Sequence, residues 1–205
     1  MSRRAALSAA ALAAMVTLSG CGGAPVVATG DMAMGADDGA KVTVIEYASV
    51  TCPHCAEWQK DTWPAFKAKY VDTNKVRYVF RELRTPPTNV AAAGFSVARC
   101  AGEDQYFTVV HALMADIETL HGPNPREALL RVGNEAGLSN KQVEDCIKSA
   151  DNLAASDERD RAAIAAGVTG TPTFLVNGAQ VMSPGSNSGA SLADLSTAID
   201  AELAK

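Results

Sequence analysis

The segment that decides the fold is TCPHC, Thr51–Cys55, in which two thiols stand three positions apart with a proline and a histidine between them. β-branched runs flank it at residues 41–47 (KVTVIEY) and 76–83 (VRYVFREL), and each is long enough for a buried strand. Residues 53–70 have a helical pattern, in which Pro64 is expected to kink or break the helix. This order predicts a βαβ unit with the thiols at the turn into the helix.

A long helical stretch follows the second strand. Its pattern predicts helices near 88–101, 104–119, 125–136, 139–148 and 151–166. Ser139 and Gln142 suit a capping box, and Gly167 stands where the last of these helices would end.

The C-terminal part returns to strands. Residues 173–176 and 180–182 are predicted strands, and the dipeptide Asn177-Gly178 between them is typical of a hairpin turn. A last helix is expected from Ser191, with Asp194 completing a capped start.

The chain therefore reads as βαβ, a helical insert of about eighty residues, and ββα. Its 205 residues, 47% hydrophobic and 20% charged, suit one globular domain with an insertion. This predicts an α/β protein with a thioredoxin-like fold. Residues 41–84 and 168–205 would form the thioredoxin-like domain, and residues 85–167 an inserted helical subdomain.

The N-terminus is typical of an export signal covering residues 1–20. Arg3 and Arg4 precede an apolar stretch, residues 5–16, that is too short to span a bilayer. Leu18-Ser19-Gly20-Cys21 resembles the bacterial lipobox, which predicts that Cys21 becomes a lipidated N-terminus after cleavage. The alternative is cleavage after a small-residue triplet, with Cys21 incidental.

Residues 21–40 are rich in Gly, Ala and Asp and lack periodicity, so we predict a flexible tether between a lipid and the folded body. Loss of residues 1–20 would remove two basic residues and no acidic one. The mature chain would then carry 16 basic and 23 acidic residues, a net charge near −7. No basic patch suggests a nucleic-acid partner.

The chemistry of the thiols follows from their place in the helix. If Pro53 lies in the first turn, Cys52 stands at the helix N-terminus, where free N–H groups and the helix dipole favour a thiolate. His54 adds a donor or a cation, and both effects lower the Cys52 pKa below about 8.5. A stabilised thiolate stabilises the reduced protein, so the disulfide becomes the better electron acceptor. Cys55 would be the buried partner.

Two other uses of the thiol pair are weaker. A structural zinc site needs four ligands, but His111 and His121 lie in the helical insert and there is no second C-x-x-C. A purely structural Cys52–Cys55 bridge would close too small a loop to constrain the unfolded chain much. We therefore expect no metal and no cofactor.

Glu46-Tyr47-Ala48-Ser49 leading into Cys52-Pro53-His54-Cys55, with residues 170–174 (GTPTF) and Asn177-Gly178 downstream, resembles the DsbA-like thiol:disulfide oxidoreductases. The likeness runs from about Asp31 to the C-terminus. It implies a periplasmic protein that donates disulfides to exported proteins with reduced cysteines. A membrane quinone reductase of the DsbB type would reoxidise it.

The resemblance also implies roles for residues outside the motif. Pro172 would be cis and would face the catalytic cysteines, with Thr171 contacting peptide substrate through its backbone. Taken alone, Pro172 would be interpreted as an ordinary trans proline that opens a strand. Glu46 lies where the family has a buried acid and could carry a proton for Cys55; the alternative is an outward-facing strand residue.

Cys100 and Cys146 each lie on a predicted helix of the insert. Pairing them would account for all five cysteines, and closing a loop of about 47 residues could contribute about 4 kcal/mol. The alternative is a pair of free buried thiols.

The leading hypothesis is a lipid-anchored, monomeric dithiol oxidase on the periplasmic side of a bacterial envelope. Thr171 complicates it, because a threonine before the cis-proline also occurs in disulfide isomerases, although residues 22–40 are too few for the dimerisation domain that those usually carry. An isomerase or reductase kept reduced in the cell is therefore the second hypothesis. The third is an envelope lipoprotein that binds metal or acts as a chaperone.

Overall fold

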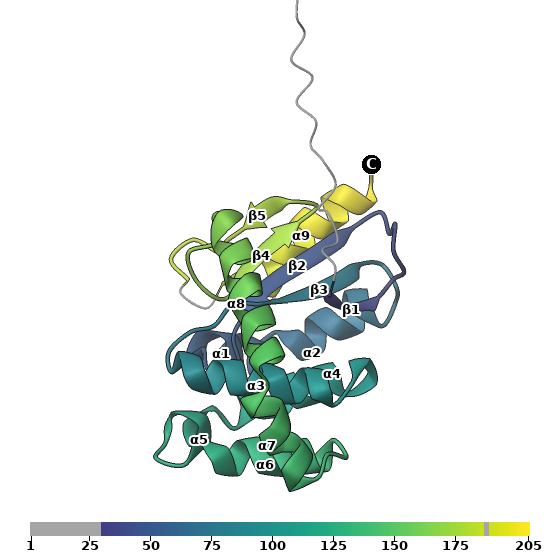
Figure 1. Ribbon diagram of the computed structural model, residues 1–205. Helices are drawn as coiled ribbons and strands as arrows, with labels where there is room; N and C mark the ends of the chain where they lie inside the picture. The colour runs from purple at the N-terminus through teal and green to yellow at the C-terminus, as the bar shows by residue number, and fades with distance from the viewer. Residues whose placement is uncertain (1–29, 187–188) are drawn as a thin grey trace, which may run out of the picture.

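The computed structural model describes residues 30–186 and 189–205, and within them the strands form one five-stranded sheet with the order β1-β3-β2-β4-β5 (Figure 1). The strands are β1 Met32–Gly35, β2 Thr43–Ala48, β3 Arg77–Glu82, β4 Thr173–Val176 and β5 Ala179–Val181. β2 and β3 are parallel, and the other neighbours are antiparallel. The prediction of a thioredoxin-like α/β fold is confirmed.

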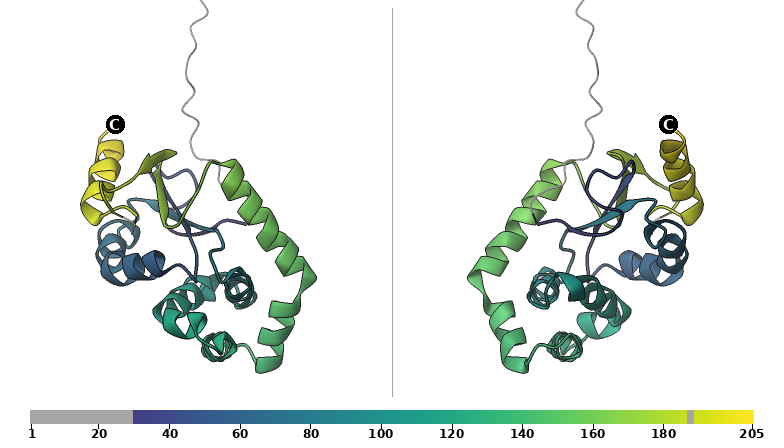
Figure 2. Two further views of the ribbon diagram at one scale, coloured as in Figure 1. Left: turned by 90° about the vertical axis from the view of Figure 1, so that its left-hand side faces the viewer. Right: turned by 90° about the vertical axis from the view of Figure 1, so that its right-hand side faces the viewer.

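The central strand β2 is buried on both faces of the sheet. Val44 and Ala48 belong to the main core, whereas Ile45 and Tyr47 belong to a second apolar cluster. Figure 2 shows why: helices lie on both sides of the sheet. On one side are α1 Pro53–Asp61, α2 Trp63–Phe66, the π-helix Lys67–Val71 and α9 Leu192–Leu203, and on the other is α8 Ala150–Ala165.

The first helical segment breaks where proline disfavours continuation. α1 ends at Asp61, and α2 starts at Trp63 with Pro64 in its first turn. The amide of Thr62 still donates to Trp58 O at 2.8 Å, so the break is a bend between two joined helices.

A block of five helices is inserted between β3 and α8 in the described chain: α3 Thr88–Cys100, α4 Glu103–Ala115, α5 Ile117–His121, α6 Pro125–Glu135 and α7 Asn140–Lys148. The helix predicted near 104–119 is in fact two, separated at Asp116. Ser139 and Gln142 form the predicted capping box, and Gly167, with φ of +82°, follows the end of α8.

Residues 32–35 correct the expectation of a tether over residues 21–40. They form β1, which pairs with β3 at the edge of the sheet, with Met32 opposite Phe80. A Cβ at Gly35 would lie 2.5 Å from the carbonyl oxygen of Val76, so only glycine allows this close approach. The four residues carry no β-branched side chain, and their strand depends on the neighbouring strand rather than on local sequence.

A buried carboxylate joins the helices to the sheet. Glu82 on β3 accepts a hydrogen bond from Arg99 of α3 and another from Arg159 of α8, each at 2.6 Å. The hydroxyl of Tyr106 on α4 also donates to Glu82, at 2.9 Å. Three helices are thus held to one strand by a single, fully hydrogen-bonded acid.

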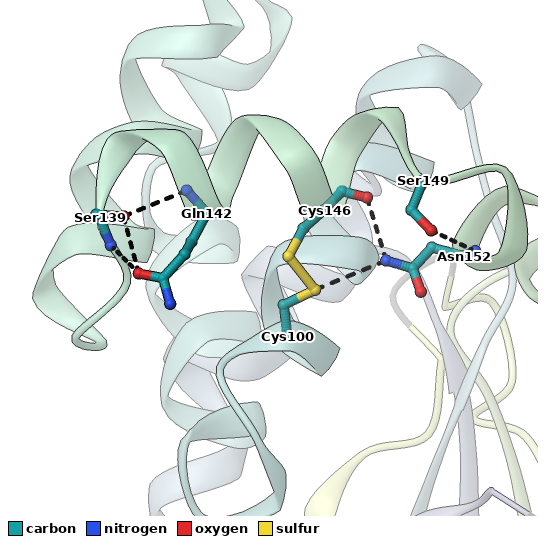
Figure 3. Close-up of a disulfide and its surroundings, with 6 residues drawn as sticks. All are labelled: Cys100, Ser139, Gln142, Cys146, Ser149 and Asn152. Atoms are coloured by element: carbon teal, nitrogen blue, oxygen red, sulfur yellow. Dashed lines mark hydrogen bonds between the residues drawn. A yellow bond between two sulfur atoms is a disulfide. The ribbon is translucent and has the colours of Figure 1, made fainter.

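Cys100 and Cys146 form a disulfide that joins the end of α3 to α7 (Figure 3). The side-chain amide of Asn152, at the start of α8, donates to Cys100 Sγ at 3.6 Å and to the carbonyl of Cys146 at 3.1 Å. The bridge therefore lies where three helices meet. Cys21, the predicted lipidation site, lies outside the described residues. None of the helices within 30–186 and 189–205 has the length and apolar character needed to cross a membrane.

Candidate active site

Cys52 caps the N-terminus of α1. Its backbone is extended, with φ of −89° and ψ of 115°, and Pro53 is the first helical residue. The Sγ atom accepts a hydrogen bond from the backbone amide of Cys55 at 3.3 Å. The sulfur thus occupies the place of a capping oxygen, where unpaired N–H groups favour negative charge.

A second segment, far away in sequence, completes the site. The Thr171–Pro172 peptide bond is cis, and Pro172 is buried just before β4. The Cys52 thiol donates to the carbonyl oxygen of Thr171 at 3.3 Å. The cis-proline segment therefore lies directly against the first thiol of the motif.

The pKa of Cys52 is lowered from 9.0 to about 6. The largest cause is the hydrogen bond from the Cys55 thiol; burial opposes it, and the Thr171 hydroxyl and the amides of Cys55 and His54 add to it. The Thr171 hydroxyl is buried and has no hydrogen-bond partner in the described part of the chain. It is thus available to donate to the thiolate.

The sequence predicted that the His54 side chain lowers the pKa of Cys52, and the structure shows a different contribution. Its side chain is exposed, and Nδ1 lies 3.7 Å from Oε2 of Glu57. It is the backbone amide of His54 that lowers the pKa of Cys52. In this structure the contribution of residue 54 therefore comes from the helix N-terminus.

Cys55 is chemically the opposite of Cys52. It is fully buried, and burial raises its pKa well above 9.0, with the charges on Cys52 and Glu46 adding to the effect. One thiol of the pair is thus a ready thiolate, and the other holds its proton.

Glu46 is buried in β2, with 2% of its surface exposed, so it does not face outward. Burial is the largest cause that raises its pKa, to about 8; the Cys52 thiolate adds to the rise, and the hydrogen bond from Tyr78 opposes it. A carboxyl group that titrates near neutral pH beside two thiols can exchange protons with them.

Tyr78 is a site residue that sequence analysis missed. It lies on β3 opposite Val44, and its hydroxyl donates to Oε2 of Glu46. The alternation of residues 76–83 puts Tyr78 on one face of its strand, but the parallel register that brings it to Glu46 cannot be read from either strand alone.

The loop before Cys52 is held by several polar contacts. The Thr51 hydroxyl donates to the carbonyl of Thr85 at 2.8 Å, and the amide of Thr85 donates to Ser49 Oγ at 3.2 Å. His121 Nε2 lies 2.8 Å from the carbonyl oxygen of Thr51. Sequence analysis considered His121 only as a metal ligand and missed this contact.

The other candidate metal ligand, His111, is elsewhere. Its ring contacts the rings of Trp63 and Phe107, and burial lowers its pKa to about 4. Across residues 30–186 and 189–205, no three His, Cys, Asp or Glu side chains are grouped so that they could hold a metal ion.

Comparisons with known proteins agree with this geometry. A family model described as Thioredoxin matches residues 28–201. A Rickettsia conorii protein, whose provisional name is protein-disulfide oxidoreductase, is 34% identical over 177 residues, 84% of this chain and 60% of that protein. This chain thus spans about three fifths of that relative's length.

Solved structures show the same fold. Alpha-DsbA1 of Wolbachia pipientis has a TM-score of 0.75 at 22% identity, covering 87% of this chain and 94% of that one. Oxidised BdbD of Bacillus subtilis has a TM-score of 0.69 at 16% identity, covering 85% and 94%. With the family match over most of its length, the chain therefore belongs to the thioredoxin family and has the DsbA-like form of its fold.

Proposed function

We propose that this protein is a thiol:disulfide oxidoreductase that donates its Cys52–Cys55 disulfide to exported proteins with reduced cysteines. The observation that carries the proposal is the contrast between the two thiols. The pKa of Cys52 is lowered to about 6, whereas that of Cys55 is raised well above 9.0. The provisional name of the Rickettsia conorii relative agrees with it.

The lowered pKa favours the oxidase direction. Near pH 7, a thiol with a pKa of about 6 is roughly nine-tenths ionised, whereas one with a pKa of 9.0 is almost wholly protonated. Ionisation thus stabilises the reduced protein by about 1.4 kcal/mol, or about 30 mV in a two-electron couple. The disulfide accepts electrons more readily by the same amount.

The reaction proceeds in two exchanges. A substrate thiolate attacks Cys52 Sγ, the Cys52–Cys55 bond breaks, and Cys55 leaves with the electron pair. A second substrate thiolate then attacks the substrate sulfur of the mixed disulfide, and Cys52 leaves as a thiolate. Substrate loses two electrons, which remain on the two enzyme sulfurs. The carbonyl of Thr171, beside Pro172, would pair with an extended substrate chain.

Glu46 would manage the proton of Cys55. With a pKa of about 8, it is mostly protonated at neutral pH and can protonate the Cys55 thiolate when the disulfide opens. During reoxidation its carboxylate would take that proton back, so that Cys55 can attack the mixed disulfide. Both steps move one proton between two buried groups.

The proposed setting of the protein rests on its N-terminal sequence. An export signal over residues 1–20 and lipidation of Cys21 would place a monomeric enzyme on the periplasmic side of a bacterial envelope. A membrane quinone reductase of the DsbB type would reoxidise it. Labelling with a lipid precursor tests the lipidation of Cys21. Trapping a mixed disulfide at Cys52 tests the reoxidation partner.

A disulfide isomerase or reductase is the second candidate, and Thr171 favours it because threonine before the cis-proline also occurs in isomerases. Such an enzyme would have a potential well below that of glutathione and would rescue scrambled substrates. A metal-binding or chaperone lipoprotein is the third candidate. It predicts stoichiometric metal at Cys52 and Cys55, or peptide binding without thiol exchange.

The deciding experiment is the equilibrium of the purified protein with glutathione, followed by oxidation of a reduced test protein. We expect a potential above that of the glutathione couple and loss of oxidation in Cys52→Ser. Cys100→Ala/Cys146→Ala, which keeps the redox pair, is the matched control. Retained oxidation in Cys52→Ser would refute the proposed function.

A further inference from the structure

The peptide group between Thr51 and Cys52 is held at both ends. Its N–H, on Cys52, donates to the carbonyl of Ser49 at 3.1 Å. Its oxygen, on Thr51, lies 2.8 Å from His121 Nε2. A carbonyl oxygen only accepts hydrogen bonds, so Nε2 of His121 must carry the proton.

The orientation of this peptide group decides where the Cys52 sulfur lies. Peptide groups are rigid planes, so their rotation about the N–Cα bond of Cys52 changes φ, and with it the direction of the side chain. Sγ accepts a hydrogen bond from the amide of Cys55 at 3.3 Å, and this bond stabilises the thiolate; the protonated thiol donates to the carbonyl of Thr171 at the same distance. A small rotation would weaken the bond from the Cys55 amide.

The helical block anchors the backbone at His121, although the residue itself is exposed. It is the last residue of α5, and its neighbour Leu120 is buried in the core. Asp116, just before α5, accepts from Arg131 of α6 at 2.7 Å and from the hydroxyl of Thr119 at 2.6 Å. The backbone that carries His121 is therefore held by elements that do not belong to the thioredoxin-like part of the chain, and the ring itself contacts the Thr51 carbonyl.

We propose that His121 is a positioning residue of the redox centre: its Nε2–H holds the Thr51 carbonyl and thereby keeps Cys52 in the geometry that stabilises the thiolate. The inserted helices then do more than cover the core, because one of their side chains adjusts the redox couple. The inference rests on the proposed function only in treating Cys52 and Cys55 as a redox pair.

The test uses three substitutions of His121 in the purified protein. His121→Ala removes the donor. His121→Gln places an amide N–H2 at nearly the distance of Nε2 from Cβ, whereas His121→Asn places it at the distance of Nδ1, which is too short to reach the carbonyl. Glu118→Ala, an exposed change on the same helix, controls for general disturbance of α5.

Two quantities are measured: the pKa of Cys52, from ultraviolet thiolate absorbance, and the equilibrium constant with glutathione. We expect His121→Ala and His121→Asn to raise the pKa of Cys52 and to shift the equilibrium towards the disulfide by about two- to tenfold, the scale of one hydrogen bond. His121→Gln should restore most of the wild-type values, and Glu118→Ala should keep them.

Two results would overturn the inference. Wild-type values in His121→Ala would show that the carbonyl needs no donor from α5. An equal shift in all three His121 variants would show that the ring itself matters, rather than the hydrogen bond. The thiolate titration requires no turnover, so it tests His121 even in a protein that fails to oxidise substrates.

Discussion

The hydroxyl group of Tyr78 donates a hydrogen bond to Oε2 of Glu46 inside the core. This bond stabilises the carboxylate and opposes the effect of burial, which raises the pKa of Glu46 to about 8. Tyr78→Phe removes the donor and keeps the ring. We expect the pKa of Glu46 in this variant to rise further, by about one unit. The measurement is an NMR titration of the Glu46 carboxyl carbon.

Tyr106→Phe is the matched control for this prediction. Tyr106 is buried in the same aromatic region, but its hydroxyl donates to Glu82. Loss of the Tyr106 hydroxyl should leave the pKa of Glu46 unchanged. If Tyr78→Phe also leaves that pKa unchanged, the hydrogen bond from Tyr78 does not contribute to it.

Sequence patterns predicted the parts of this molecule that depend on local chemistry. Strands β2 and β3 were readable from β-branched runs, and the place of Cys52 followed from Pro53 in the first turn of α1. Each of these features is written in a few consecutive residues.

The missed features depend on partners far away in sequence. β1 forms by pairing with the free edge of β3, since nothing in residues 32–35 themselves favours a strand. Tyr78 and His121 acquire their roles only when the sheet register and the helical block bring them to Glu46 and Thr51. Side chains of this kind need a fold before their function can be recognised.

Glu46 should make stability depend on pH. Its pKa is about 8 in the folded protein against 4.5 as an ordinary value, so the folded state holds a proton that the unfolded state loses. The stabilisation is fully present below about pH 4.5 and is lost as the pH rises towards about 8, up to about 5 kcal/mol in total.

Glu46→Gln removes this dependence, because an amide does not titrate. We expect the free energy of unfolding of the variant, measured with urea, to fall less than that of wild type between about pH 5 and about pH 9. The disulfide form is used, so that Cys52, whose lowered pKa acts in the opposite direction, does not titrate. The Cys52 thiolate, which adds to the raised pKa of Glu46, is then absent, so the effect is smaller than in the reduced protein. Parallel pH profiles would contradict the prediction.

The Cys100–Cys146 disulfide should serve stability rather than redox chemistry. It closes 46 positions of chain, which corresponds to about 4 kcal/mol in the loop-entropy account. Cys100→Ala/Cys146→Ala should therefore lower the free energy of unfolding by about 2–5 kcal/mol and keep the Cys52–Cys55 potential unchanged. A changed potential would mean that the bridge also shapes the active site.

Gly94 on α3 allows the helical block to approach the active-site loop. A Cβ at this position would lie 2.8 Å from Cγ2 of Val50 and 3.1 Å from Cδ1 of Leu113. Val50 is fully buried and stands two residues before Cys52. A methyl group at residue 94 therefore has to displace the loop that carries the reactive thiol.

Gly94→Ala should destabilise the protein by about 1–3 kcal/mol and raise the pKa of Cys52. Val50→Ala removes the obstructing methyl groups, so the double variant should lose less stability than the two single variants together. Gly170→Ala is the control, because a Cβ there meets nothing within 4 Å. If the losses of stability in the double variant are additive, the methyl group added at residue 94 does not clash with the Val50 side chain. The loop would then have room to accept that methyl group.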